Sequence, residues 1–264
     1  MQPKSIDIHA HLTFNEFGSD ILEVLQKTLD QETWVINIGA DVDTSISALE
    51  IAKKYSEGIF ASVGVHPMAV DKVSVSDWQK LEEIARDDKI VAIGECGLEF
   101  LKITDEEKER QIIFFRKHIE LALSVNKPLM IHCRDAYEDT LRILKEYKDK
   151  VGEKLRGDIH FFAGSLEQAK QFVNLGFTLS FTGVITFTTQ YDEVVKWLPV
   201  NMIMAETDCP YVSPAPYRGK RNEPLYVAEV LKKMAELRGV TYEEMTRTNL
   251  DNARRIFGLG SPYS

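Results

Sequence analysis

Short apolar runs rich in β-branched residues alternate with longer stretches of helical spacing along this chain of 264 residues. The apolar runs are Ser5–Leu12, Thr33–Ala40, Ile59–Val65, Ile90–Cys96, Pro128–Cys133, Gly157–Phe162, Phe177–Thr182 and Asn201–Thr207. The amphipathic stretches are Ser19–Leu29, Ser45–Tyr55, Trp78–Arg86, Asp105–Ser124, Ala136–Tyr147, Leu166–Leu175, Tyr191–Trp197 and Pro224–Arg238. Strands so nearly continuous in apolar residues are typical of parallel sheets covered on both faces. Eight such repeats predict an α/β fold, the (β/α)8 TIM barrel, as a single domain over residues 1–264, with a doubly wound open sheet as the alternative.

The composition excludes several other classes of protein. Hydrophobic residues make up 44% and charged residues 28%, which is ordinary for a compact globular chain. The net charge of −9 disfavours broad electrostatic binding to nucleic acid or to an anionic membrane, although bound cations can create a local site for nucleic acid on an acidic protein. Because the sequence has no run of 18 apolar residues and no signal-peptide core after Met1, we expect a cytoplasmic protein without a membrane partner. Cys96, Cys133 and Cys209 are odd in number and far apart, which indicates reduced thiols.

Ionisable residues lie near the carboxyl ends of five of the eight predicted strands, the first, fourth, fifth, sixth and eighth. They are His9, His11, Glu95, His132, His160 and Asp208. In a parallel barrel all carboxyl ends open onto one face, where the active sites of this fold are found. We therefore expect these six side chains to converge on one pocket.

Each of these residues also has a structural interpretation. His9 and His11 are two apart in a strand and project to the same side, so both can reach one ion, but they could equally be hydrogen-bonded core histidines. Asp7 has the same parity and could orient an imidazole or form a salt bridge. A buried Glu95 is costly without a counter-charge, which two cations would supply by sharing it, whereas the alternative is a carboxylate that caps the following loop.

Taken together, the six residues predict a pair of metal ions. Four histidines and two carboxylates suit Zn²⁺ or Mn²⁺, and Mg²⁺ where oxygen and water ligands dominate. His118 lies inside a predicted helix, and we interpret it as a helix residue without a role in the site.

The residues around these positions resemble the TatD family of metal-dependent deoxyribonucleases, which belongs to the amidohydrolase-like barrels. The resemblance runs in order from residue 6 to about residue 257. Its motifs are His9-Ala10-His11, Gly64-Val65-His66-Pro67, Ile93-Gly94-Glu95-Cys96-Gly97-Leu98, Ile131-His132-Cys133-Arg134-Asp135, His160-Phe161-Phe162-Ala163-Gly164, Glu206-Thr207-Asp208-Cys209-Pro210-Tyr211 and Gly219-Lys220-Arg221-Asn222-Glu223-Pro224.

The resemblance implies a division of the ligands between two ions. It assigns one ion to His9, His11, Glu95 and Asp208, and the other ion to Glu95, His132 and His160. Related barrels of the phosphotriesterase branch bridge their ions with a carbamylated lysine on the fourth strand, and no lysine lies at that strand end here. Many family members carry Asp and an aromatic residue after Gly-Leu, whereas this chain has Glu99 and Phe100. We expect that departure to affect the substrate loop rather than the metal site.

The same residues predict a hydrolytic mechanism on a phosphodiester. Asp208 and Glu95 are the candidate catalytic residues, with Asp208 as general base and metal ligand. The candidates for substrate binding are His66, Arg134, Lys220, Arg221 and Tyr211. Arginine offers a planar fork suited to phosphate oxygens, although Arg134 could instead pair with Asp135 and the two loop cations could simply be solvated. An aromatic ring at Tyr211 can stack on a base.

Two alternatives to a nuclease acting on DNA ends or single strands remain at this point. The same ions could direct a water at a carbonyl group, as in an amidase, a lactonase or an aminoacyl-tRNA deacylase, because fold and metals do not define the substrate. A non-catalytic metal-bound scaffold is the other alternative, and an open metal position argues against it. A monomer is compatible with the sequence, which does not define the oligomeric state, the physiological metal or the choice between DNA and RNA.

Overall fold

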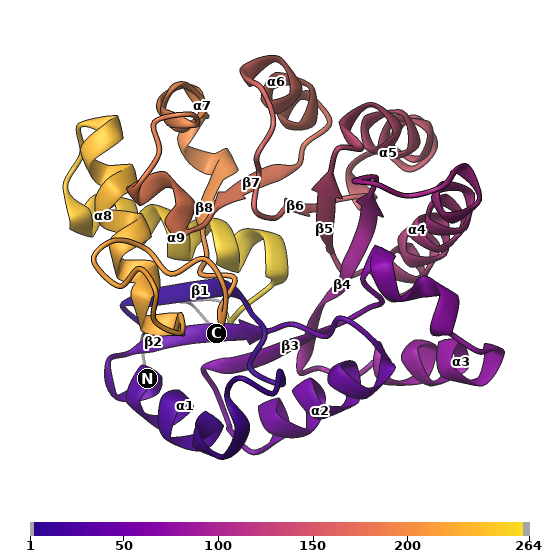
Figure 1. Ribbon diagram of the computed structural model, residues 1–264, viewed down its shortest axis with the longest axis horizontal. Helices are drawn as coiled ribbons and strands as arrows, with labels where there is room; N and C mark the ends of the chain where they lie inside the picture. Colours follow the sequence, from indigo (N-terminus) through magenta and orange to yellow (C-terminus); the bar gives the residue numbers. More distant parts are fainter. Residues whose placement is uncertain (1–2, 261–264) are drawn as a thin grey trace.

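The computed structural model describes residues 3–260, so both ends of the expected domain, residues 1–2 and 261–264, lie outside the described residues. Within that part, eight parallel strands form one sheet whose spatial order is the order of the chain (Figure 1). They are β1 (Ser5–Ala10), β2 (Thr33–Asn37), β3 (Ile59–Val63), β4 (Ile90–Glu99), β5 (Leu129–Arg134), β6 (Gly157–Ile159), β7 (Thr178–Phe181) and β8 (Ile203–Ala205). In an open doubly wound sheet the strand order would reverse partway across the sheet, and here it does not. That alternative is wrong, and the predicted barrel is confirmed.

Helices α1 to α8 surround the strands on the outside (Figure 1). The α-helices are α1 (Ile21–Asp30), α2 (Val42–Lys53), α3 (Val75–Ile84), α4 (Asp105–Val125), α5 (Tyr137–Val151), α6 (Leu166–Asn174), α7 (Asp192–Trp197), α8 (Val227–Arg238) and α9 (Tyr242–Phe257). Short 3-10 helices occupy Gly18–Asp20, Pro67–Lys72, Gly152–Lys154, Gly183–Thr186, Val200–Met202 and Pro224–Tyr226. None of the helices within residues 3–260 combines the length and the apolar character needed to cross a membrane.

Helix α9 is not among the helices expected from the sequence. Its start carries a capping box, in which the Thr241 side chain accepts a hydrogen bond from the Glu244 amide and the Glu244 side chain accepts one from the Thr241 amide. A glycine in the left-handed conformation, Gly258, ends it. Both signals are present in the sequence, so α9 could have been found by looking beyond the eighth repeat.

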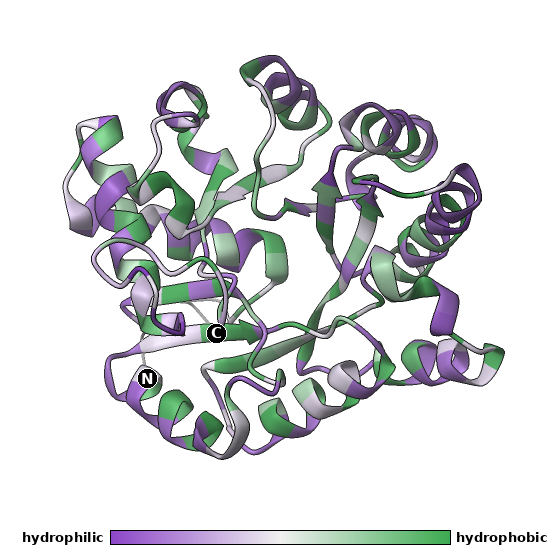
Figure 2. Ribbon diagram, in the orientation of Figure 1, coloured by the Kyte–Doolittle hydropathy of each residue, from purple (hydrophilic) through white to green (hydrophobic). Residues whose placement is uncertain are grey.

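Helix α9 packs against β1, β6 and β8 and joins the second of two hydrophobic clusters. That cluster combines residues in or just after strands with residues in or just after α9, namely Ile6, Ile8, Trp34, Ile36, Ile38, Val91, Ala92, Met130, Met204, Leu250, Ala253, Ile256, Phe257 and Leu259. The larger cluster lies between strands and the surrounding helices. Burying one such large apolar side chain contributes about 1.5–3 kcal/mol. Figure 2 shows the strands mostly hydrophobic and the helices two-sided, as a sheet covered by helices requires.

The barrel closes between β8 and β1 mainly through side chains. In residues 3–260 one isolated bridge, Ala10 with Cys209, joins these edges beyond the end of β8. Further down, Asn249 of α9 accepts a hydrogen bond from the Ala205 amide (2.8 Å) and donates one to the Ile6 carbonyl (2.9 Å). The buried Asn249 side chain therefore stands where a direct backbone ladder would otherwise run.

The Asp7 carboxylate stabilises the same junction between β8 and β1. It accepts hydrogen bonds from the Thr207 amide (2.9 Å) and the Thr207 hydroxyl (2.5 Å), and from the His9 amide (3.2 Å). Burial raises the pKa of Asp7 to about 8. Asp7 thus holds backbone groups of the two edge segments and contacts no imidazole nitrogen through any of these bonds.

His118 links helix α4 to the chain after β3. Its Nε2 accepts a hydrogen bond from the Val65 amide (3.0 Å), so the neutral ring carries its proton on Nδ1 and donates it to the Phe114 carbonyl (2.7 Å). Burial lowers the pKa of His118 to about 4. This histidine is therefore a structural residue, and it anchors the segment that carries His66.

Replacing Asn249 with Ala is expected to lower the free energy of unfolding by about 3 kcal/mol. The reason is that a buried amide and a buried carbonyl would each lose their partner, at about 1–3 kcal/mol per group. Urea unfolding followed by circular dichroism measures the change, and Asp251→Ala, at an exposed position of the same helix, is the matched control. Equal stabilities of the two variants would contradict the role of Asn249 in closing the barrel.

His118 is expected to make the protein less stable as the pH falls from 6.5 towards 4. Its folded-state pKa lies below the ordinary value of 6.5, so the unfolded chain takes up the proton first and the stabilisation, complete above pH 6.5, is lost on acidification. The loss attributable to this residue is about 3 kcal/mol at pH 4. We expect urea unfolding of His118→Gln at pH 7 and pH 4 to show a correspondingly smaller decrease, and parallel profiles for the two proteins would argue against it.

Candidate metal centre

The structure brings the six predicted ligands together at the carboxyl ends of the strands. His9 lies within β1 and His11 follows it, His132 lies in β5, and His160 follows β6. Asp208 follows β8 and has a left-handed backbone, with φ of +55°. Its amide donates a hydrogen bond to the His9 carbonyl (2.9 Å), which turns the end of β8 over the end of β1.

Glu95 lies in the middle of β4, not at its end as the sequence analysis expected, because this strand continues to Glu99. Gly94, with φ of +150°, precedes it, and a Cβ atom at this position would collide with the Met130 carbonyl oxygen. The glycine therefore lets β4 approach β5 closely just before Glu95, whose side chain is buried at the centre of the ligand cluster.

One oxygen of Glu95 faces a first group of side chains. Glu95 Oε2 lies 3.3 Å from His11 Nε2 and 3.8 Å from His9 Nε2. Asp208 Oδ1 lies 3.5 Å from His11 Nε2 and 3.7 Å from His9 Nε2. The two imidazole nitrogens are themselves 3.1 Å apart. Four donor atoms from β1, β4 and the end of β8 thus surround one point.

The other oxygen of Glu95 faces a second group. Glu95 Oε1 lies 3.0 Å from His132 Nδ1 and 2.9 Å from His160 Nε2, and these two nitrogens are 3.3 Å apart. The carboxylate therefore stands between two sets of histidines with one oxygen turned to each.

These spacings fit divalent ions. Ligand atoms that each lie about 2.1 Å from a tetrahedral ion are about 3.4 Å from one another, and the donor atoms of both groups are separated by 2.9–3.8 Å. Imidazole nitrogens with carboxylate oxygens form a donor set typical of Zn²⁺ and Mn²⁺.

The buried negative charge of the cluster also favours the binding of cations. Burial would raise the pKa of Glu95, but the imidazoles of His66 and His160 hold it well below its usual range. Burial likewise opposes ionisation of Asp208, whose pKa is nevertheless lowered by its hydrogen bond with His11. Two ionised carboxylates are thus buried together, and such charges are stable only beside positive charge.

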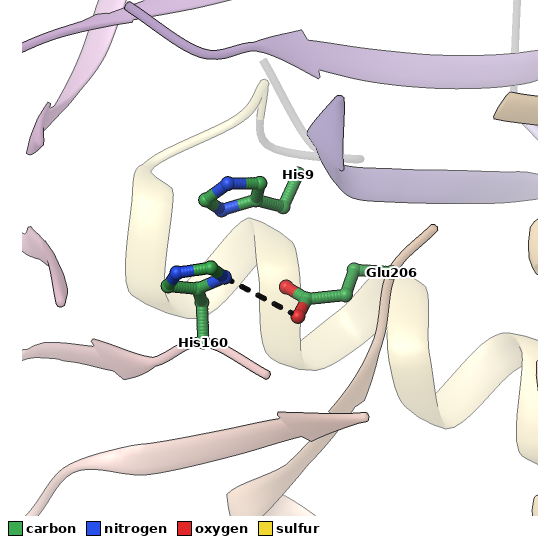
Figure 3. Close-up of side chains that lie close together, drawn as sticks. All are labelled: His9, His160 and Glu206. Atoms are coloured by element: carbon green, nitrogen blue, oxygen red, sulfur yellow. Dashed lines mark ion pairs between the residues drawn. The ribbon is translucent and has the colours of Figure 1, made fainter. Parts of the chain in front are cut away.

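A third group, His9, His160 and Glu206, also has donor atoms close together (Figure 3). The His9 and His160 rings are stacked with centroids 3.9 Å apart. Glu206 Oε1 lies 3.6 Å from His160 Nδ1 and accepts a hydrogen bond from the Phe161 amide (2.6 Å), and Oε2 accepts one from the Ser180 hydroxyl (2.9 Å). Because Glu206 faces the nitrogen of His160 that points away from Glu95, we interpret it as a support for the ring.

His66 reaches the second group from the loop after β3. Its Nε2 lies 3.6 Å from Glu95 Oε1, and its Nδ1 accepts a hydrogen bond from the Met68 amide (3.2 Å). Burial lowers the pKa of His66 to about 4, so the ring is neutral and carries its proton on Nε2. In this state Nε2 is a donor, which suits binding of a substrate oxygen better than binding of an ion.

The cluster forms the floor of a cavity of about 610 Å³. Of the predicted substrate-binding residues, His66, Arg134 and Tyr211 line this cavity. The Arg134 side chain is 61% exposed and lies 3.9 Å from Glu99, and an ion pair with Asp135 is not found in the described part of the chain. A groove of about 870 Å³ between α1, α8 and α9 is larger, but its lining residues include no histidine.

The two other predicted phosphate-binding residues do not line the cavity. Arg221 makes two hydrogen bonds to Asp20 (2.8 and 3.0 Å), one to Glu223 (3.2 Å), and lies over the Phe17 ring. These contacts explain why its pKa is raised by the Asp20 carboxylate, and they hold the guanidinium in the loop structure. Lys220 is exposed to solvent.

The structure also shows residues that the sequence analysis missed. Phe14 lines the cavity, stacks on the His11 ring at 4.5 Å and lies 6.2 Å from the Tyr211 ring. Glu99 contacts His132, with Oε2 3.1 Å from Nε2, although we expected it to act in the substrate loop. Its position four residues after Glu95 on the same strand was a usable signal, because i and i+4 share a face. Nothing in the sequence marked Phe14.

The three cysteines beside the cluster are buried free thiols. Cys133 Sγ lies 3.3 Å from the Thr140 hydroxyl, and burial raises its pKa to about 12. This agrees with packing roles for the cysteines and leaves the histidines and carboxylates as the donor set.

A parallel barrel with histidines and carboxylates gathered at its carboxyl face is the arrangement of a metal-dependent hydrolase. The profile of the family described as "TatD related DNase" matches residues 6–258. The chain therefore belongs to the TatD family and is a metal-dependent hydrolase, as its motifs indicated.

Individual relatives agree with this assignment. The chain is 38% identical to an uncharacterized metal-dependent hydrolase, YabD, of Bacillus subtilis, over 96% of this chain and 98% of that protein. It is 28% identical to the 3'-5' ssDNA/RNA exonuclease TatD of Pantoea ananatis, over 96% and 99% of the two chains. The crystal structure of YjjV, a TatD homologue of Escherichia coli, superposes with a TM-score of 0.89 at 27% identity, over 98% and 100% of the chains.

Proposed function

We propose that this protein is a nuclease that cleaves phosphodiester bonds at the ends of single-stranded nucleic acid, with two divalent ions held by the cluster around Glu95. The observation that carries this proposal is the orientation of Glu95, whose Oε2 faces His9 and His11 while Oε1 faces His132 and His160. The name of the exonuclease relative supports nucleic acid as the substrate class.

The positions of the donor atoms indicate which residues would hold each ion. His9, His11 and Asp208 would hold the first with Glu95 Oε2, and His132 and His160 would hold the second with Glu95 Oε1. When bound, two such ions supply Lewis-acid activation of a water and of the phosphodiester. Zn²⁺ and Mn²⁺ match these nitrogen-rich ligands best.

The chain's own residues would position the substrate and move the proton. Asp208 stays ionised because its pKa is lowered by His11 despite burial, so its carboxylate is able to accept a proton. His66 presents an N–H group to the cavity, and Arg134 offers a guanidinium fork at its rim to phosphate oxygens. Phe14 and Tyr211 form an aromatic wall on which a base can stack, and Tyr211 is 48% exposed.

Lys220 and Arg221 are proposed to act only through the long loop after β8. Arg221 ties that loop to Glu16 and Asp20 after β1, and Tyr211 donates a hydrogen bond to Glu16 from the same loop. Arg221 would thus hold Tyr211 at the cavity. Lys220 would add a solvent-exposed positive charge near the nucleic-acid chain that enters the cavity. We further propose that the protein acts in the cytoplasm, on DNA or RNA, as a monomer.

Removal of the ions is expected to abolish activity. Hydrolysis of a single-stranded oligonucleotide should stop after chelation with EDTA and return on addition of Mn²⁺, Zn²⁺ or Mg²⁺. Glu95→Gln should lower kcat/KM by more than about 100-fold, because its amide offers one neutral oxygen in place of the shared carboxylate. Glu109→Gln, at an exposed position of α4, is the control. Full activity in the presence of EDTA would contradict the proposal.

Arg134→Ala is expected to raise KM for an oligonucleotide by about 10–100-fold, since an arginine–phosphate hydrogen-bonded pair contributes about 1.5–3 kcal/mol. The same variant should keep its bound metal, measured by elemental analysis, and Arg142→Ala on the outer face of α5 should behave as the unsubstituted protein. If the protein hydrolysed carboxylic esters or amides but no phosphodiester, the chemistry would belong to a carbonyl substrate instead.

A further inference from the structure

Glu99 is a buried carboxylate at the end of β4 that the proposed mechanism does not use. Its Oε2 lies 3.1 Å from His132 Nε2, and its Oε1 accepts a hydrogen bond from the Leu101 amide (3.1 Å). The Glu99 amide in turn donates to Gln111 Oε1 of α4 (2.9 Å). Both the carboxylate and the backbone of Glu99 are therefore fixed by neighbouring groups.

The pairing of β4 with β5 places Glu99 over the His132 ring. Gly97 is opposite His132 and Glu99 is opposite Arg134 in this ladder. Gly97 has φ of +136°, and a Cβ atom there would collide with the His132 carbonyl oxygen. The glycine thus allows the two strands to stay in close contact beyond Glu95, so that one face of β4 delivers a carboxylate to each side of the same imidazole.

The two nitrogens of His132 each face a carboxylate, Nε2 at 3.1 Å from Glu99 Oε2 and Nδ1 at 3.0 Å from Glu95 Oε1. Since a carboxylate accepts hydrogen bonds, a ring that would bind an ion through the Nδ1 lone pair would keep its proton on Nε2 and donate it to Glu99. Nδ1 is the nitrogen that faces Glu95 Oε1 and His160 Nε2. This is the tautomer that a ligand of the second ion requires.

We propose that Glu99 is a positioning residue that orients His132 for the second ion and also restrains Arg134 at the cavity rim. The inference rests on the proposed two-ion site. Glu99 Oε2 lies 3.9 Å from the Arg134 guanidinium, so one carboxylate oxygen faces both a metal-ligand candidate and a phosphate-binding candidate. Outer carboxylates of this kind fix ring orientation and typically change metal affinity 10–100-fold when removed.

The arrangement at the other ligand of this ion is different. Glu206 Oε1 lies 3.6 Å from His160 Nδ1, beyond hydrogen-bond distance, and the His160 ring is instead stacked on His9. His132 is half-buried, and its outer nitrogen is held by the Glu99 contact. The orientation of His132 therefore depends on Glu99 more than that of His160 depends on Glu206.

Calorimetric titration of the metal-stripped full chain with Mn²⁺ tests the proposal. The unsubstituted protein should bind two Mn²⁺, and Glu99→Ala should bind the second about 10–100-fold more weakly while the first binds as before. Glu99→Gln keeps a hydrogen-bond acceptor without the charge, so it should recover most of the lost affinity even if the alanine variant folds poorly. Glu109→Ala, an exposed glutamate on α4, is the control.

A second measurement reports on the tautomer itself. Proton NMR of the Zn²⁺-loaded protein should show a downfield Nε2–H resonance of His132 that persists in Glu99→Gln and disappears in Glu99→Ala. Two Mn²⁺ bound to Glu99→Ala with unchanged affinity would overturn the role of Glu99 and leave the two-ion site intact. Fewer than two Mn²⁺ bound to the unsubstituted protein would overturn the two-ion site and this inference together.

Discussion

A hydrogen bond from the Asp208 amide to the His9 carbonyl joins the two edges of the sheet, and the candidate metal centre depends on it. His9 and His11 belong to the first strand, whereas Asp208 follows the last, so these side chains meet only if the barrel closes. Closure is achieved without a full ladder between β1 and β8, through Asn249 and Asp7 and the bridge beyond β8. The packing of α9 is therefore part of what builds the site.

Beneath the candidate metal centre, the Ser180 hydroxyl lies between two buried carboxyl groups. The Ser180 hydroxyl lies 2.5 Å from Asp158 Oδ2 and 2.9 Å from Glu206 Oε2. A hydroxyl has one proton and can donate to one of these oxygens, so one carboxyl group must retain its own proton. Burial raises the pKa of Asp158 to about 8, which identifies it as the protonated partner. Glu206 Oε2 then accepts the Ser180 hydroxyl proton, while Glu206 Oε1 faces His160 Nδ1.

The sequence predicts the fold and the side chains that meet in the candidate metal centre for physical reasons that can be stated. Apolar runs reveal buried parallel strands, and ionisable residues at their ends are conspicuous because such positions are otherwise apolar. The apolar run that predicts β4 ends at Cys96, whereas the strand continues to Glu99, so the contact of Glu99 with His132 was missed although its spacing from Glu95 was a usable signal. It also does not show which loop cations find partners, so the ion pair of Arg221 with Asp20 required the structure.

The separation of Asp208 from His9 along the chain has a consequence for synthesis. A ribosome makes the amino-terminal strands first, and loops between distant contacts close late because their entropic cost is high. A nascent chain that has not yet released the segment around Asp208 lacks one of the ligand candidates, even if the earlier repeats have already folded. The candidate metal centre is thus completed only when the segment after β8 has folded against β1.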